Sequence, residues 1–212
     1  MKDPAFIPDY SLYLATDTSV LSRFGDEFVA VLESCLGSGG ATMLQLRFKE
    51  LPTRTFYELG LRVRAVTSRL RVPLIVNDRV DLAMALSADG VHLGRSDLPP
   101  AAARRLLPRG LIGCSANLPD DVRRAQDAGA DYIGAGPVFR TATKSDTGPE
   151  LGLDGLRQIV LSSRLPVVAI GGIGTASIGA VRKTGAAGVC LISAVFQAPN
   201  PAEATRRLRS LS

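Results

Sequence analysis

The chain has 212 residues, with 25 lysines and arginines against 20 aspartates and glutamates, which gives a net charge of +5 at pH 7. A chain of this length can bury enough surface to fold as one α/β domain without a disulfide or metal staple. The positive charge is mild and forms no run, and aromatic residues are only 5%. This composition does not by itself indicate a nucleic-acid partner, because small anionic ligands would suit it equally well.

Cysteine and histidine are scarce. The chain has three widely separated cysteines, Cys35, Cys114 and Cys190, and one histidine. No Cys-x-x-Cys pair occurs, so a zinc site is not expected, and free thiols favour a reducing cytoplasm. The start, MKDPAFIPDY, has Asp and Pro where a signal peptide needs an apolar core, so we expect no export signal. No apolar run approaches the roughly 20 residues of a membrane span.

Strand-like and helix-like segments alternate along the chain. Strand patterns cover residues 11–16, 41–47, 73–76, 90–94, 111–115, 132–138, 166–172 and 187–193. Helical patterns follow them at 27–36, 56–70, 80–87, 100–107, 119–129, 153–163, 176–185 and 201–211. Such alternation predicts parallel strands with right-handed crossovers, and eight units favour a closed barrel over an open sheet. We therefore expect residues 1–212 to form a single-domain α/β (β/α)8 TIM barrel, with residues 1–10 as an N-terminal extension.

Polar residues gather after the predicted strands, where barrels carry their functional sites. Gln45, Arg47 and Lys49 alternate along the second strand and so share one face, which suits a multiply charged anion such as a diphosphate. The alternative is an amphipathic strand with its polar face in solvent. A barrel interior offers no such face, so we favour the anion site.

Two carboxylates follow neighbouring strands, Asp78 after the third and Asp97 a few residues beyond the fourth. Parallel strands lie about 4.8 Å apart, so the two acids can meet beside the cations. Oxygen ligands without His or Cys favour Mg²⁺. Both acids could instead be helix N-caps, and their spacing alone leaves the two interpretations evenly balanced. Asp81 suits a capping or helix-dipole role, and Arg79 a helix start paired with a nearby acid.

Two further segments of the same rim could hold phosphate. The long loop from Arg140 to Leu151 carries hydroxyls and a lysine, although a solvated polar loop is an equal alternative. Gly171-Gly172 allows close approach of a ligand, and Ile192-Ser193 precedes a short helical stretch, AVFQ. These glycines could also serve only to turn the chain.

Two other residues are assigned structural positions. We expect His92, in the middle of the fourth strand, to be a packed barrel residue rather than a catalyst. Cys114 should face the helices if Ser115 points inward, because neighbouring residues of a strand face opposite sides.

The segments QLRFK, VNDRVDLAMALSADGVHLGRSDLP, GADYIGAGPVFRTATK, VVAIGGI and VCLIS together resemble the thiamine-phosphate synthase family. That family is a (β/α)8 barrel that joins a hydroxymethylpyrimidine diphosphate to a thiazole phosphate and releases pyrophosphate. The resemblance implies a cytoplasmic, Mg²⁺-dependent transferase with two phosphorylated small-molecule substrates and no nucleic-acid or membrane partner, and it leaves a homo-oligomeric state open. It assigns the pyrimidine diphosphate to Gln45, Arg47, Lys49, Asn77, Ser115 and Lys144, Mg²⁺ to Asp78 and Asp97, and the thiazole phosphate to Thr141, Ala142, Thr143, Gly172, Ile192 and Ser193. Arg47, Lys49, Ser115 and Lys144 would be the catalytic residues.

Three alternatives stay open. A related thiazole tautomerase uses a His after the fifth strand, where this chain has Ser115, Ala116 and Asn117. Many synthases also carry a His near Asn117, and its absence here departs from that common pattern. A non-catalytic binding protein would not need the acids or Lys144. A Schiff-base aldolase would use Lys49 or Lys144 as the amine and would be trapped by borohydride.

Overall fold

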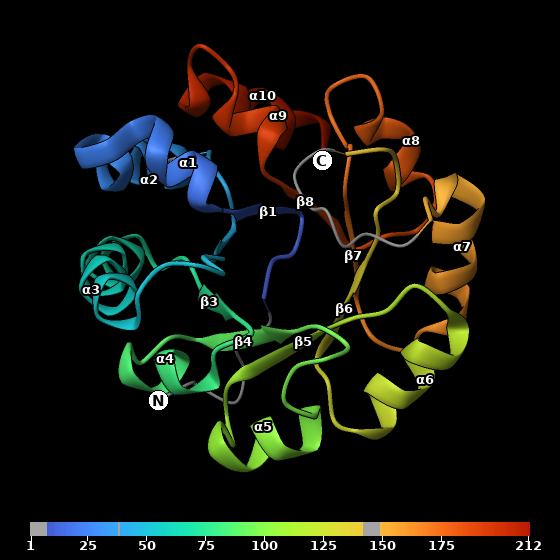
Figure 1. The fold of residues 1–212 in the computed structure, drawn as a ribbon. Coiled ribbons are helices and arrows are strands. Elements are labelled where there is room, and N and C mark those ends of the chain that lie inside the picture. Colours follow the sequence, from blue (N-terminus) through green and yellow to red (C-terminus); the bar gives the residue numbers. More distant parts are fainter. Residues whose placement is uncertain (1–7, 38, 142–148) are drawn as a thin grey trace.

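The computed structural model describes residues 8–37, 39–141 and 149–212, and these form one closed parallel barrel wrapped by helices (Figure 1). The strands follow one another around the barrel in chain order, and β1 pairs with both β2 and β8. Their bounds are β1 Leu12–Ala15, β2 Met43–Leu46, β3 Leu74–Asn77, β4 Gly90–Leu93, β5 Leu111–Ser115, β6 Tyr132–Ala135, β7 Val167–Ile170 and β8 Gly188–Leu191. The predicted barrel and its eight strands are confirmed.

Helices cover the outside of the barrel (Figure 1). In the described residues they are α1 Thr18–Phe24, α2 Phe28–Leu36, α3 Thr53–Leu70, α4 Val80–Ala85, α5 Pro100–Leu106, α6 Pro119–Asp127, α7 Gly152–Ser162, α8 Ile178–Arg182, α9 Ser193–Phe196 and α10 Pro201–Leu211, with a 3-10 turn at Gly25–Glu27. The helix α1 was not predicted. Asp17 begins it, because its carboxylate accepts a hydrogen bond from the Val20 amide at 3.0 Å.

The core has two layers, as expected when side chains alternate along the strands. The outer layer packs strands against helices. Here Leu44 and Leu46 are fully buried, and the Phe48 ring lies 5.2 Å from that of Phe56. The inner layer fills the barrel with Tyr10, Tyr13, Ala15, Met43, Ile75, Leu111, Tyr132, Val168 and Cys190. The barrel is therefore a filled core, and any ligand space must lie at its mouth.

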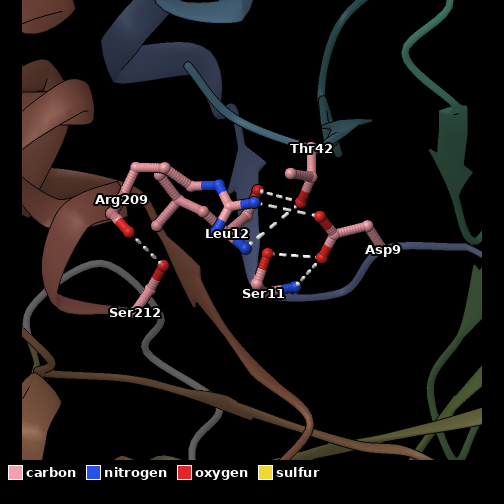
Figure 2. A network of polar contacts seen from close by, with 6 residues as sticks. All are labelled: Asp9, Ser11, Leu12, Thr42, Arg209 and Ser212. Atoms are coloured by element: carbon pink, nitrogen blue, oxygen red, sulfur yellow. Dashed lines mark hydrogen bonds and ion pairs between the residues drawn. The ribbon is translucent and has the colours of Figure 1, made fainter. Parts of the chain in front are cut away.

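The segment just before β1 is hydrogen-bonded to the last helix, α10 (Figure 2). Asp9 accepts hydrogen bonds from the amide and hydroxyl of Ser11 and from Arg209 of α10, the last at 3.0 Å. Thr42 donates its hydroxyl to the Leu12 carbonyl at 2.9 Å. These contacts fix the segment that leads into β1 where β1 closes the barrel against β8. In the part of the chain that the structure describes, no helix has the length and apolar character needed to cross a membrane.

Candidate active site at the mouth of the barrel

A cavity of about 280 Å³ opens where the strands end. Its wall combines strand ends with the loops that follow them, so residues far apart in sequence meet there. Most of the predicted site residues line it: Gln45, Arg47, Lys49, Asn77, Asp78, Asp97, Ser115, Thr141, Gly172, Ile192 and Ser193. The predicted residues Ala142, Thr143 and Lys144 lie outside the described residues.

The cationic side of the cavity comes from β2 and the residues after it. Gln45, Arg47 and Lys49 all line the cavity, whereas Phe48 packs into the outer layer. The alternation predicted for QLRFK is thus confirmed, and the solvent-facing alternative is wrong. Two cations beside each other at a concave mouth give the charge and the donors that a diphosphate requires.

The two acids do not cap helices. The N-cap of α4 is Arg79 and that of α5 is Pro99, and neither makes a side-chain capping bond. Asp97 instead accepts a hydrogen bond from the Gly94 amide at 2.7 Å. Asp78 has φ 61°, a left-handed conformation that is uncommon for a residue other than glycine and that tends to cluster at functional sites. The helix-cap alternative is therefore wrong for both residues.

Arg79 pairs with a nearby acid as predicted, and Asp81 has the position expected for a helix-dipole role but does not cap the helix. Arg79 forms an ion pair with Asp81 at 2.6 Å, and Asp81 lies in the first turn of α4. The hydrogen bond from Arg79 holds the pKa of Asp81 below its ordinary value. Arg79 and Asp81 therefore bind each other, and Asp78 lines the cavity.

Asp78 and Asp97 face each other across the ends of β3 and β4. The pKa of Asp78 is raised from 3.8 to about 6: burial has the largest effect, the hydrogen bond and negative charge of Asp97 act in the same direction, and the positive charges of Lys49 and Arg47 oppose them. Two carboxylates this close repel one another unless a proton or a cation lies between them. The pair therefore has the chemistry of an oxygen-ligand site for a divalent cation.

The two carboxylates suit Mg²⁺ in their number and in their chemistry. No group of three or more His, Cys, Asp or Glu side chains that could hold a metal is found among the described residues. Mg²⁺ does not need one, since it commonly takes one or two carboxylates and completes its shell with water and substrate phosphate. Asp78 and Asp97 fit that pattern.

The opposite side of the mouth is formed by β7 and β8. Gly171 and Gly172 have φ of 98° and 66°, and a Cβ atom on Gly172 would lie 2.6 Å from the Arg140 carbonyl oxygen. The glycines are thus required for turning, and they also line the cavity with Ile192 and Ser193. Ser193 begins the four-residue helix α9. The turning role of the glycines is confirmed, and the phosphate site at this segment stays a prediction.

Sequence reasoning missed the polar interior below the mouth. Tyr13 and Tyr132 line the floor of the cavity, and His92 contacts both Tyr132 and Ser115. His92 is packed in the barrel as predicted, yet it is also part of the cavity wall. The inward direction of Tyr13 and Tyr132 follows from strand alternation, a signal that was present in the sequence. Cys114 is buried in the outer layer and Ser115 faces the cavity, as predicted.

Fold and cavity together define an α/β-barrel protein whose mouth places two cationic side chains beside an acidic pair. A family model described as thiamine monophosphate synthase matches residues 12–195. A thiamine-phosphate synthase of Desulfitobacterium hafniense is 45% identical over 204 residues, covering 96% of this chain and 97% of that protein. One from Chloroflexus aurantiacus is 47% identical over 207 residues, covering 98% and 94%.

The fold comparison agrees with the sequence comparison. A solved structure of thiamine phosphate pyrophosphorylase from Pyrococcus furiosus superposes with a TM-score of 0.85 at 41% identity, covering 96% of this chain and 95% of that one. The chain belongs to the thiamine monophosphate synthase family.

Proposed function

We infer that this chain catalyses the synthesis of thiamine phosphate, by joining 4-amino-2-methyl-5-hydroxymethylpyrimidine diphosphate to 4-methyl-5-(2-phosphoethyl)thiazole with release of pyrophosphate. The observation that carries this proposal is the convergence, in one cavity, of the cations Arg47 and Lys49 with the facing acids Asp78 and Asp97. Family membership supports the same activity.

We assign the pyrimidine diphosphate to the side of the cavity formed by β2, β3 and β5. Arg47 and Lys49 would donate hydrogen bonds to the diphosphate, and Gln45, Asn77 and Ser115 would contact the pyrimidine end. Lys144, outside the described residues, keeps the role at the diphosphate that the family resemblance gives it. The thiazole phosphate would take the other side, against Gly172, Ile192, Ser193 and Thr141, together with Ala142 and Thr143.

The chemistry is a dissociative substitution at the methylene carbon of the pyrimidine. Arg47 and Lys49 stabilise the negative charge that develops on the diphosphate as its bond to carbon breaks. The electron-rich aminopyrimidine supports the resulting cation, and the thiazole nitrogen, held in line from the other side, attacks it. Mg²⁺ bound by Asp78 and Asp97 would supply further charge neutralisation to the leaving group. No general base is required for these steps.

The cysteines bear on the cellular location that we propose. Cys35, Cys114 and Cys190 are free and buried, which favours the cytoplasm that we propose as its location. A homo-oligomeric state remains a prediction.

The test is release of pyrophosphate by the full chain, measured with both substrates and Mg²⁺. We expect release that needs both substrates, together with one thiamine phosphate per pyrophosphate. Release without the thiazole phosphate would indicate simple hydrolysis and would contradict the proposal. Covalent trapping by borohydride with a carbonyl ligand would favour the aldolase alternative instead.

A further inference from the structure

A continuous chain of hydrogen bonds crosses the barrel interior beneath the cavity. Gln45 donates its side-chain amide to the Tyr13 hydroxyl at 2.8 Å, and the Tyr13 and Tyr132 hydroxyls lie 3.1 Å apart. The Tyr132 hydroxyl lies 3.2 Å from His92 Nδ1, and His92 Nε2 lies 3.1 Å from Ser115 Oγ. Five side chains from five strands are thus joined, and both ends of the chain, Gln45 and Ser115, line the cavity.

Two glycines of the barrel leave room for the side chains of this hydrogen-bond network. A Cβ atom on Gly113 would lie 2.1 Å from Tyr132 Cζ, and one on Gly134 would lie 2.8 Å from His92 Cε1. Glycine at these two positions leaves the room that the Tyr132 and His92 rings occupy. Tyr13 and Tyr132 are 1% and 0% exposed, so their hydroxyls are cut off from bulk water and depend on these partners.

Burial also keeps the two hydroxyls neutral, because it raises the pKa of Tyr13 and of Tyr132 far above the ordinary value for tyrosine. A neutral hydroxyl has one proton to donate. Tyr13 already accepts from Gln45, so its own proton goes to Tyr132. The Tyr132 proton then goes to His92 Nδ1. A neutral imidazole that accepts at Nδ1 carries its proton on Nε2 and donates it to Ser115.

This direction has consequences at both ends of the chain. Gln45 presents its Nε2 to Tyr13, and among the described residues its Oε1 makes no hydrogen bond, so an acceptor remains for a ligand. Gln45 is only 5% exposed, and it lines the cavity. Ser115 accepts from His92, so its hydroxyl proton is available to a ligand. In the opposite direction, with Gln45 still donating, the fully buried Tyr13 proton would have no acceptor.

We propose that Tyr13 and Tyr132 are positioning residues that fix the side chain of Gln45 as an acceptor and Ser115 as a donor, so that the site selects an aminopyrimidine over an oxopyrimidine. A 4-aminopyrimidine offers an amino donor beside a ring-nitrogen acceptor, and this arrangement matches. The 4-oxo ring offers an oxygen acceptor beside a ring N–H donor, and it does not. This specificity rests on the proposed function.

The first test needs no substrate. His92 is the single histidine of the chain, so an untagged ¹⁵N-histidine sample gives one imidazole signal pair without assignment. We expect the shifts of a neutral ring protonated on Nε2 and accepting at Nδ1. Tyr132→Phe should change the Nδ1 shift, whereas Tyr10→Phe should not. Tyr10 is a matched control, because its ring packs 5.2 Å from that of Tyr132 but its hydroxyl is not part of the hydrogen-bond network described above.

A ring protonated on Nδ1, or an Nδ1 shift that Tyr132→Phe leaves unchanged, would overturn the proposed direction. This outcome is independent of turnover, so it can be told apart from a failure of the proposed function, which would show as an absence of thiamine phosphate from the wild-type chain.

The second test is kinetic. In Tyr13→Phe and Tyr132→Phe we expect the KM for the aminopyrimidine diphosphate to rise about tenfold and its preference over the 4-oxo analogue to fall by about the same factor. The KM for the thiazole phosphate should be unchanged. The double variant should lose little more of this preference than either single variant, because each substitution interrupts the same hydrogen-bond network. Unchanged preference in both single variants, or equal loss for both substrates, would overturn the proposal.

Discussion

The acidic pair makes a quantitative prediction for Asp78→Asn. The pKa of Asp78 is raised from 3.8 to about 6, so the folded protein holds this proton more tightly than the unfolded chain does. For this group the free energy of unfolding is therefore highest below about pH 3.8 and falls as the pH rises through about 6. At pH 7.5 the folded chain carries the full penalty of the charged carboxylate.

The size of that penalty follows from the difference between the two pKa values. A difference of about two corresponds to about 3 kcal/mol, and partial exposure of the side chain reduces this to about 1 to 2 kcal/mol. Asparagine keeps the shape and removes the charge. We thus expect Asp78→Asn to raise the free energy of unfolding by about 1 to 2 kcal/mol at pH 7.5, and by much less at pH 4.5.

The assay is urea unfolding at both pH values, with and without Mg²⁺ and pyrophosphate. The wild-type chain should gain stability from the added ligands, and Asp78→Asn should gain less. Asp81→Asn is the control, because Asp81 pairs with Arg79 and not with Asp97. It should lose under about 1 kcal/mol and keep the response to ligand. Equal stability of wild type and Asp78→Asn at pH 7.5, with equal responses to ligand, would refute the reasoning.

The remaining predictions concern the two anion sites. Gly172→Ala should lower the free energy of unfolding by about 1 to 3 kcal/mol, because its Cβ would meet the Arg140 carbonyl in a left-handed backbone conformation. Gly174→Ala, with nothing within 4 Å, should be close to neutral in the same urea titration, and equal losses would contradict this explanation. Lys49→Met should lower kcat about 100-fold or more through lost stabilisation of the leaving diphosphate, while the exposed Lys183→Met should not. A wild-type kcat in Lys49→Met would remove this lysine from the chemistry.

Much of the architecture could be predicted because it depends on local patterns. Strand-like segments that alternate with helical patterns predicted the eight strands, and the two-residue period of a strand placed Gln45, Arg47 and Lys49 on one face and Phe48 on the other. The short helix α1 was missed, although Asp17 directly before Thr18 is an N-cap signal. Its seven residues are too few for a clear apolar period.

The acids show where sequence reasoning ends. Asp78 and Asp97 occupy positions before helices, so spacing alone could not separate a cap from a ligand. Only the three-dimensional structure shows that Arg79 and Pro99 are the N-caps and that the two carboxylates face each other. Similarly, the contact of His92 with Ser115 depends on the room left by Gly113 and Gly134, which no pattern in one strand reveals.

The central claim is that one cavity brings the two phosphorylated substrates together beside a metal held by Asp78 and Asp97. The most direct measurement is a crystal structure of the full chain with thiamine phosphate, pyrophosphate and Mn²⁺ in place of Mg²⁺. The account predicts an anomalous peak that contacts both carboxylates, pyrophosphate on Arg47 and Lys49, and the phosphate of thiamine phosphate against Gly172 and Ser193. Metal bound away from Asp78 and Asp97, or both anions on one side of the mouth, would contradict it.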